Sequence, residues 1–406
     1  MKIGADGQFH LTYCSNIHPG EHWPEVFANL ETYIPPLKSR FVPKDPFGIG
    51  LRLANPASQE LLEGDALSRF KEWLDQNDLY VFTLNGFPYG GFHRQVVKEE
   101  VYAPDWSTAD RQTYTVRLAK ILAALLPEGI DGGISSVPVS YKPWFKEQKE
   151  RNDCLEQSCI QLATTVQTLM DLQAESGKWI HLDLEPEPDG MLENSTDVIE
   201  FFEQWLVPKG GAHLAKALDI SVTRAQEHIL RHIGICYDTC HFAVSYEKPQ
   251  EVLERFKRAG IRIGKIQISA ALKLKLQASA QARQSALERL EPFAESTYLH
   301  QVVEKRSDGT FHTYSDLIDA LPHLSETPGQ EWRIHFHVPI FIEDYQTLQS
   351  TQEDIKTVLE LLQANPVCPH LEIETYTWEV LPAEMKMELA ASIEREYEWV
   401  LSHISE

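Results

Sequence analysis

Acidic and amide side chains end four apolar, strand-like runs in the 406-residue chain. Glu185 follows WIHLDL, Asp238 ends IGICYD, Gln267 lies in IGKIQIS, and Glu374 follows LEI. Because alternate residues of a strand face opposite sides, each of these side chains lies opposite the apolar face of its own run. Carboxylates that gather in a poorly hydrated place repel one another unless a cation neutralises them. These oxygen ligands predict a divalent metal ion, Mg, Mn or Co.

Histidines accompany these acids. His241 lies one helical turn after the aspartate of DTCH, close enough to be a further ligand. His335 and His337 form an HFH pair on one face of a strand, a spacing that reaches a single metal ion or a substrate; a packed or exposed polar face is the alternative. Imidazole ligands shift the predicted metal toward Mn, Co or Zn. Cys236 and Cys240 have no second cysteine pair and are only a weak zinc signal.

The elements that would position these residues alternate between strand-like and helical patterns. Eight runs have the character of strands: 9–16, 48–55, 80–86, 132–138, 179–188, 233–238, 263–269 and 371–376. Amphipathic helical patterns lie between them, at 60–76, 108–126, 144–173, 222–233 and 249–260, with Ser107 and Ser221 as predicted N-caps. This alternation predicts an α/β fold, a (β/α)8 TIM barrel. An open doubly wound sheet is the rival, but no GxGxxG motif follows the first strand.

The interval between the last two strands, about 270–370, is too long for one helix. It contains a helical pattern at 277–293, an extended stretch at 296–314, and RIHFHVPIF at 333–341, which is expected to be an extra strand. We therefore expect a single barrel domain over residues 1–406, with 270–370 as an insertion between strands seven and eight.

The early strands add polar side chains to the same mouth of the barrel, where the active sites of such folds are built. Alternation directs Asn16, His18 and Asn85 inward, and His93 follows in the loop after the third strand. We expect these four side chains to bind the hydroxyl groups of a substrate. The loop NGFPYGGFH at 85–93 is either a cover over that substrate or a simple turn.

The composition limits the classes of partner. Lys and Arg total 37 against 60 Asp and Glu, which gives a formal net charge of −23. This charge repels phosphate backbones, so nucleic acid is not an expected partner. No run has the length of a membrane span, and the amino terminus lacks the apolar core of a signal peptide. Six cysteines without a CxxC pair favour buried thiols in a reducing compartment, so a cytoplasmic location is expected.

Several motifs carry a family resemblance. DTCHFAVSY at 238–246, EP at 185–186 and ET at 374–375 resemble signatures of the xylose-isomerase-like TIM barrel superfamily, which includes endonuclease IV. Over nearly its full length the chain resembles the EboE-type metabolite traffic proteins. The most specific passages are TYCSNIHPGEHW, LNGFPYGGFH, VKEEVYAPDW, TYLHQV, WRIHFHVPIF and LEIETYTWEVLP.

The superfamily resemblance implies a site for one or more divalent ions. It assigns ligand roles to Glu185, Asp238, His241 and Glu374, while Gln267 stands where the superfamily has a histidine. The HFH of 335–337 occupies a place comparable to a late DxH of endonuclease IV. The EboE resemblance implies movement of a precursor metabolite out of the cytoplasm, with partners in an export pathway, and supplies no reaction.

Three functions follow from these observations. The first is an isomerase or epimerase for a small hydroxylated metabolite, in which Glu185 and Glu374 remove and return a proton beside a bound metal ion. The second is a non-catalytic metabolite carrier or export-assembly partner, with which Gln267 is consistent. The third, an endonuclease IV-like phosphodiesterase, is opposed by the net charge and by the missing histidine. The sequence identifies neither the substrate, nor the metal, nor the oligomeric state.

Overall fold

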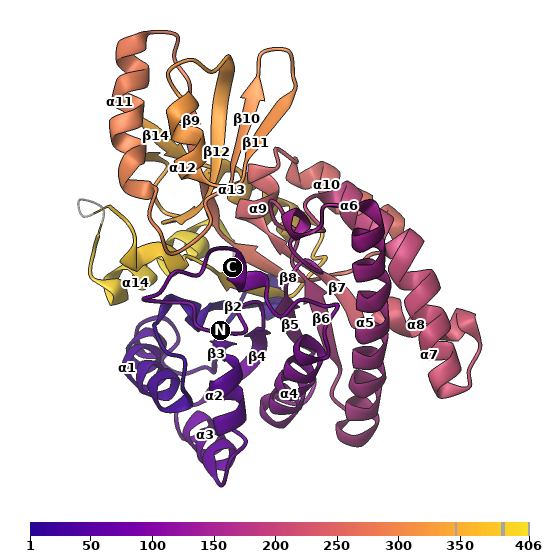
Figure 1. The fold of residues 1–406 in the computed structure, drawn as a ribbon. Coiled ribbons are helices and arrows are strands. Elements are labelled where there is room, and N and C mark those ends of the chain that lie inside the picture. The colour runs from indigo at the N-terminus through magenta and orange to yellow at the C-terminus, as the bar shows by residue number, and fades with distance from the viewer. Residues whose placement is uncertain (346, 383–385, 405–406) are drawn as a thin grey trace.

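Eight parallel strands form a barrel in the computed structural model of the chain, which describes residues 1–345, 347–382 and 386–404. The strands are β2 (Phe9–Tyr13), β3 (Phe47–Arg52), β4 (Leu79–Asn85), β5 (Gly132–Ser136), β6 (Ile180–Leu184), β7 (Ile233–Asp238), β8 (Ile263–Ile268) and β15 (His370–Ile373). Their order is β2–β15–β8–β7–β6–β5–β4–β3, and β1 (Lys2–Ile3) adds antiparallel to β2. All eight strand predictions are confirmed (Figure 1).

The barrel closes between β2 and β3 through a side chain. Thr12 Oγ1 donates to the Gly48 carbonyl at 3.0 Å and accepts from the Gly50 amide at 2.8 Å. Cys14 and Gly50 add a parallel bridge. A Cβ atom at Gly50 would lie 2.0 Å from Glu372 Oε1, so glycine there leaves room for an inward carboxylate. The closed ring confirms the (β/α)8 barrel and excludes the open doubly wound sheet.

Helices pack around the outside of the barrel (Figure 1). They are α1 (Trp23–Phe41), α2 (Asn55–Glu60), α3 (Ala66–Gln76), α4 (Ala109–Leu125), α5 (Gln148–Ser176), α6 (Ser195–Glu200), α7 (Gly211–Leu218), α8 (Val222–His232), α9 (Thr239–Val244), α10 (Pro249–Ala259), α13 (Gln352–Ala364) and α14 (Leu389–His403). No helix within the described ranges has the length and apolar character needed to span a membrane.

Two local predictions about helix ends differ from the structure. The helix predicted at 60–76 begins only at Ala66, as α3, because α2 ends at Glu60 and a turn that includes Gly64, at a φ of 56°, separates the two helices. The N-cap of α4 is Thr108 rather than Ser107: Thr108 Oγ1 accepts from the Arg111 amide at 3.4 Å, while the Ser107 hydroxyl turns to Asp105. Ser221 is confirmed as the N-cap of α8.

The segment between β8 and α13 forms an antiparallel sheet of its own, drawn in orange at the top of Figure 1. Its strands are β9 (Ala270–Lys275), β10 (Val302–Arg306), β11 (Phe311–Tyr314), β12 (Gly329–Val338), β13 (Asp344–Tyr345) and β14 (Leu348–Ser350), with α11 (Ala280–Leu290) and α12 (Leu317–Ala320) beside them. The insertion is therefore confirmed. The predicted extra strand is β12, which pairs with β9 and β10 and does not join the barrel. A single domain over the whole chain stays a prediction.

The barrel interior is charged rather than apolar. Lys265 Nζ on β8 lies 2.6 Å from Glu372 Oε2 on β15, and both side chains are fully buried. Lys265 also donates to Ser135 Oγ at 3.2 Å, across the barrel. Asp183 points inward from β6, and an added Cβ at Gly264 would lie 2.0 Å from its Oδ1. The predicted strand alternation therefore holds inside the barrel, and this central ion pair lies beneath the mouth.

Candidate metal centre at the barrel mouth

Asp238 lies at the junction between the apolar strand β7 and the short helix α9, which carries His241. It is the N-cap of α9, where its Oδ1 accepts from the His241 amide at 3.1 Å and from Ser269 Oγ at 2.7 Å. Capping one turn of helix brings the His241 ring back beside the same carboxylate. The other oxygen, Oδ2, is buried without a hydrogen-bond partner and lies 3.8 Å from His241 Nε2.

The hydrogen bonds of two histidines define which ring nitrogen carries a lone pair. His241 Nδ1 lies 3.0 Å from the Pro186 carbonyl, and His337 Nδ1 lies 2.8 Å from the Glu374 carbonyl. A carbonyl oxygen only accepts, so Nδ1 is the donor in both rings and Nε2 is left unprotonated. Burial lowers the pKa of His241 to about 4 and lowers the pKa of His337, which keeps both rings neutral.

These two Nε2 atoms face each other at 3.4 Å. Two lone pairs at this separation repel unless something positive lies between them. Two nitrogens bound at about 2.0–2.1 Å to one tetrahedral ion are themselves roughly 3.4 Å apart. Asp238 completes a group of three potential ligand atoms that all lie within 4.8 Å of one another. The residues therefore fit a divalent metal ion.

His335 is oriented in the same way by the insertion. Its Nδ1 lies 2.7 Å from Gln301 Oε1, and the amide of Gln301 is fixed because its Nε2 donates to the Pro188 carbonyl at 3.0 Å. His335 Nε2 is therefore also a lone pair, and it is buried without a partner. Glu187 joins His335 and His241 in a second group of potential ligands. Sequence reasoning missed Glu187, although it shares the parity of Glu185 in EPEP.

Three carboxylates meet beside the histidines. Glu185, Asp238 and Glu374 offer oxygens within 4.8 Å of one another. Burial, followed by the charge of Asp238, raises the pKa of Glu185 to about 8, and burial with the neighbouring acids raises the pKa of Glu374 well above its ordinary range. Glu374 Oε1 accepts from the side-chain amides of Asn16 at 2.7 Å and Asn85 at 2.9 Å. Carboxylates this close and this buried are stabilised by a cation.

Gln267 stands next to these acids on β8, in register with Asp238 of β7 and Glu372 of β15. Its side chain is fully buried, and neither its oxygen nor its nitrogen has a hydrogen-bond partner among the described residues. Such a group costs free energy unless something polar reaches it. Its carbonyl oxygen is thus available to an ion or to a substrate.

The four residues predicted to bind substrate divide into two pairs. Asn16 and Asn85 line the pocket, but their amide N–H groups are taken by Glu374. His18 and His93 are buried and do not line it. A 3-10 turn at 15–17 ends the strand alternation, and the His18 ring accordingly stacks on Tyr33 of α1. The signal that could have found this was the short, polar SNI segment after β2.

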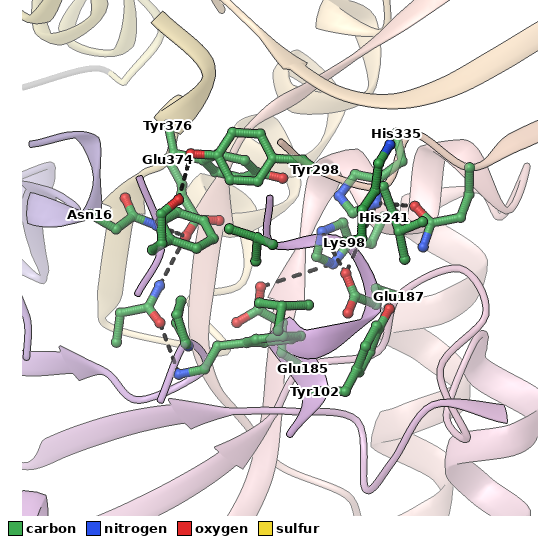
Figure 2. Close-up of a pocket in the computed structure, with 18 residues that line it drawn as sticks. Asn16, Lys98, Tyr102, Glu185, Glu187, His241, Tyr298, His335, Glu374 and Tyr376 are labelled. Atoms are coloured by element: carbon green, nitrogen blue, oxygen red, sulfur yellow. Dashed lines mark hydrogen bonds and ion pairs between the residues drawn. The ribbon is translucent and has the colours of Figure 1, made fainter. Parts of the chain in front are cut away.

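The pocket itself is partly open, and about 530 Å³ of space, open solvent included, lies between its walls. Figure 2 shows the lining acids Glu185, Glu187 and Glu374, the histidines His241 and His335, and the rings of Tyr102, Tyr298 and Tyr376. Asp238, Gln267 and His337 are buried beside the pocket and do not line it. The predicted Gly-rich loop contributes Phe87, Pro88 and Phe92 to the wall. Further lining residues that sequence reasoning missed are Val97, Lys98, Val101, Tyr102, Tyr298, Leu299, Gln301 and Tyr376. Cys240, His335 and His337 form one more group of potential ligands nearby.

The solved structures to which the chain is similar share little of its sequence. No protein-family model matches the sequence, and no curated protein matches it. A xylose isomerase-like TIM barrel protein from Mycobacterium smegmatis in complex with magnesium is 10% identical over 99% of this chain and 98% of that chain, with a TM-score of 0.47. The IOLI protein with a binding zinc atom is 12% identical over 98% of this chain and 99% of that chain, with a TM-score of 0.43. A xylose isomerase domain protein from Alicyclobacillus acidocaldarius is 10% identical over 97% of this chain and 99% of that chain, with a TM-score of 0.41.

Proposed function

We propose that the chain is a divalent-metal-dependent enzyme that moves a proton on a small hydroxylated metabolite, as isomerases and epimerases do. The observation that carries the proposal is the convergence of imidazole nitrogens and buried carboxylates: His241, Glu185 and Glu374 line the pocket, and Asp238 and His337 lie within 4.8 Å of members of that set. Asp238, His241 and His337 would hold the ion, because their lone pairs already face one another. The proposed further ligands are Glu185, Gln267, His335 and Glu374.

A bound divalent ion would hold neighbouring substrate oxygens and make the adjacent C–H group more acidic. The side chains of the protein would transfer the proton. Asn16 and Asn85 both donate to Glu374 Oε1, which leaves Oε2 as the atom available to a substrate. Glu185 Oε2 is also buried without a partner. A carboxyl whose pKa is raised to about 8, as at Glu185, is close to the value that suits a general base near neutral pH.

The two glutamates are close enough to act on one small substrate. Glu185 and Glu374 each have an oxygen within 4.8 Å of the other. This proximity supports a proton transfer in which one carboxylate removes the proton and the other returns it.

The walls of the pocket favour an uncharged substrate. Aromatic and aliphatic side chains surround the polar floor, so a bound metabolite is removed from water. Lys98 lines the pocket, but its Nζ is already 2.5 Å from Asp316 Oδ2. A phosphate group would gain little electrostatic stabilisation from Lys98, because the ammonium group is already paired with Asp316. The endonuclease IV-like reaction is accordingly not proposed.

A carrier is the second candidate, because Gln267, a neutral amide, stands among the acids where the resembled superfamily has a histidine. In this case the pocket would bind the metabolite without altering it, within a metabolite traffic pathway. The two candidates share the metal ion and the pocket and differ only in turnover.

The test is solvent exchange. Protein loaded with Mn²⁺ or Zn²⁺ would be incubated in D₂O with a panel of ketoses and polyhydroxylated cyclic ketones, and deuterium incorporation followed by NMR. We expect exchange with at least one compound, its loss in Glu374→Gln, and its retention in Glu353→Gln, an exposed control on α13. Binding detected by calorimetry without exchange would reject the enzyme and support the carrier.

A further inference from the structure

A second cluster of potential ligands lies at the opposite end of the barrel. His181 is the second residue of β6, His370 is the first residue of β15, and Asp131 immediately precedes β5. These are the amino ends of the strands, whereas the pocket lies at their carboxyl ends. In the sheet, β7 and β8 separate β6 from β15, so the three side chains meet across the barrel floor. Their ligand atoms lie within 4.8 Å of one another.

Three of the four imidazole nitrogens in this cluster have no hydrogen-bond partner among the described residues. His181 Nδ1 lies 2.7 Å from Asp183 Oδ2, so it donates to that carboxylate and leaves Nε2 as a lone pair. Among the residues that the structure describes, His181 Nε2 has no hydrogen-bond partner, and neither ring nitrogen of His370 has one. Both rings are fully buried. Buried imidazole nitrogens without partners are costly, and native proteins seldom retain them.

Asp131 stands between the two rings. Its Oδ2 lies 3.4 Å from His181 Nε2, and its Oδ1 lies 3.4 Å from His370 Nε2. An ion-pair cluster with two imidazolium rings is the competing explanation. The rings are stacked, with centroids 5.5 Å apart at 28°, so two positive charges would repel at close range in a dry interior. Burial also lowers the pKa of His370.

We propose that Asp131, His181 and His370 bind a second divalent transition-metal ion, with zinc as the natural occupant. Two imidazoles and one carboxylate are a common zinc ligand set. Asp183 orients His181 through Nδ1, and Arg262 Nη2 supports that carboxylate at 3.6 Å, the arrangement that commonly fixes a metal-binding histidine.

This ion would link strands that are distant in the chain. β15 follows the long insertion and α13, and it is the last strand of the barrel in the chain. An ion on the floor would join β15 to β5 and β6. Asp131 also borders a surface hollow with Lys178 and Trp179, which gives the ion and a water ligand a route to the site. The role is structural and does not depend on the function proposed for the mouth.

The experiment measures metal binding at the Asp131–His181–His370 cluster in a protein whose mouth site has lost two of its imidazoles. In a His241→Gln/His337→Gln background, Zn²⁺ titration calorimetry and the visible absorption of Co²⁺ should still report one bound ion. Asp131→Asn in that background should abolish it, and Asp183→Asn should weaken it by roughly 10- to 100-fold at unchanged stoichiometry. His312→Gln, an exposed histidine, is the matched control and should change nothing.

Circular dichroism checks that each variant folds. Anomalous scattering from crystals of the zinc-saturated wild-type protein tests the site without any substitution. An anomalous peak between Asp131 and the two rings is expected. Its absence, or a folded background protein that binds no Zn²⁺, would overturn the proposal and leave an ion-pair cluster. A failure of the mouth site appears separately, as equal zinc content in the wild type and the background.

Discussion

Lys265→Met tests the charged interior of the barrel. The substitution removes the ammonium group from a pair whose atoms are 2.6 Å apart and fully buried, and it leaves the Glu372 carboxylate without its partner. Breaking a buried ion pair by removing one member costs about 3–5 kcal/mol. Since a folded domain is stable by about 5–15 kcal/mol, the variant should lose a large share of its free energy of unfolding.

The assay is urea denaturation followed by tryptophan fluorescence. Lys149→Met is the matched control, because Lys149 pairs with Asp153 at 2.6 Å but its side chain is 80% exposed, and its loss should not measurably alter stability. Lys265→Met/Glu372→Gln should recover about 1–3 kcal/mol relative to the single variant, since no charge is then left alone. If Lys265→Met is no less stable than the Lys149 control, the described interior is wrong.

Four further predictions concern residues in and around the barrel. Gly264→Ala should destabilise the protein by about 1–3 kcal/mol, because the new Cβ would lie 2.0 Å from Asp183 Oδ1 in a packed interior; urea denaturation measures this. Zinc binding at pH 7 should release protons, because the pKa of Glu185 is about 8 and the carboxyl must ionise to bind; affinity should rise with pH up to about 8, as calorimetry in two buffers will show. In the metal-free protein the same carboxyl holds its proton more tightly when folded, so stability should fall as the pH rises from its ordinary pKa of 4.5 to about 8. Asn85→Leu should weaken metal binding by about 10- to 100-fold, because Glu374 Oε1 loses the amide donor at 2.9 Å.

Three of these predictions have a control or an outcome that would contradict them. Gly90→Ala adds a methyl group where no heavy atom lies within 4 Å, and equal losses in the two alanine variants would contradict the packing around Asp183. Buffer-independent binding heats would show that Glu185 is already ionised. Asn152→Leu alters an exposed amide on α5 and should leave metal affinity unchanged; a similar loss in both leucine variants would contradict the role given to Asn85.

The barrel and its inward acids could be predicted because they depend on local alternation. Residues two apart in a strand share a face whatever the rest of the chain does, and this placed Glu185, Asp238 and Glu374 correctly at the mouth. The rule failed at His18, where a 3-10 turn interrupts the strand and changes the direction of the ring. Parity predicts only as far as the strand continues.

The insertion could be predicted only as an interval. Its antiparallel sheet depends on pairing between β9, β10 and β12, whose contacts join residues far apart in sequence, and no short pattern encodes that register. The placement of His335 beside Glu187 depends on this sheet and was therefore beyond the sequence. His181 and His370 had the inward parity of Asp183 and Glu372, but their meeting with Asp131 requires the closed barrel.

The origin of the ligands at the mouth has a consequence for how the chemistry of the protein can change. The barrel strands supply the carboxylates, whereas β12 of the insertion supplies two of the imidazoles. If the proposed ligands hold an ion, exchange of residues 270–350 for a short loop would remove His335 and His337 and leave the carboxylates with one imidazole, His241. Such an oxygen-rich set would shift the preference toward a harder ion such as Mg²⁺, so the appended sheet would set the metal preference independently of the barrel.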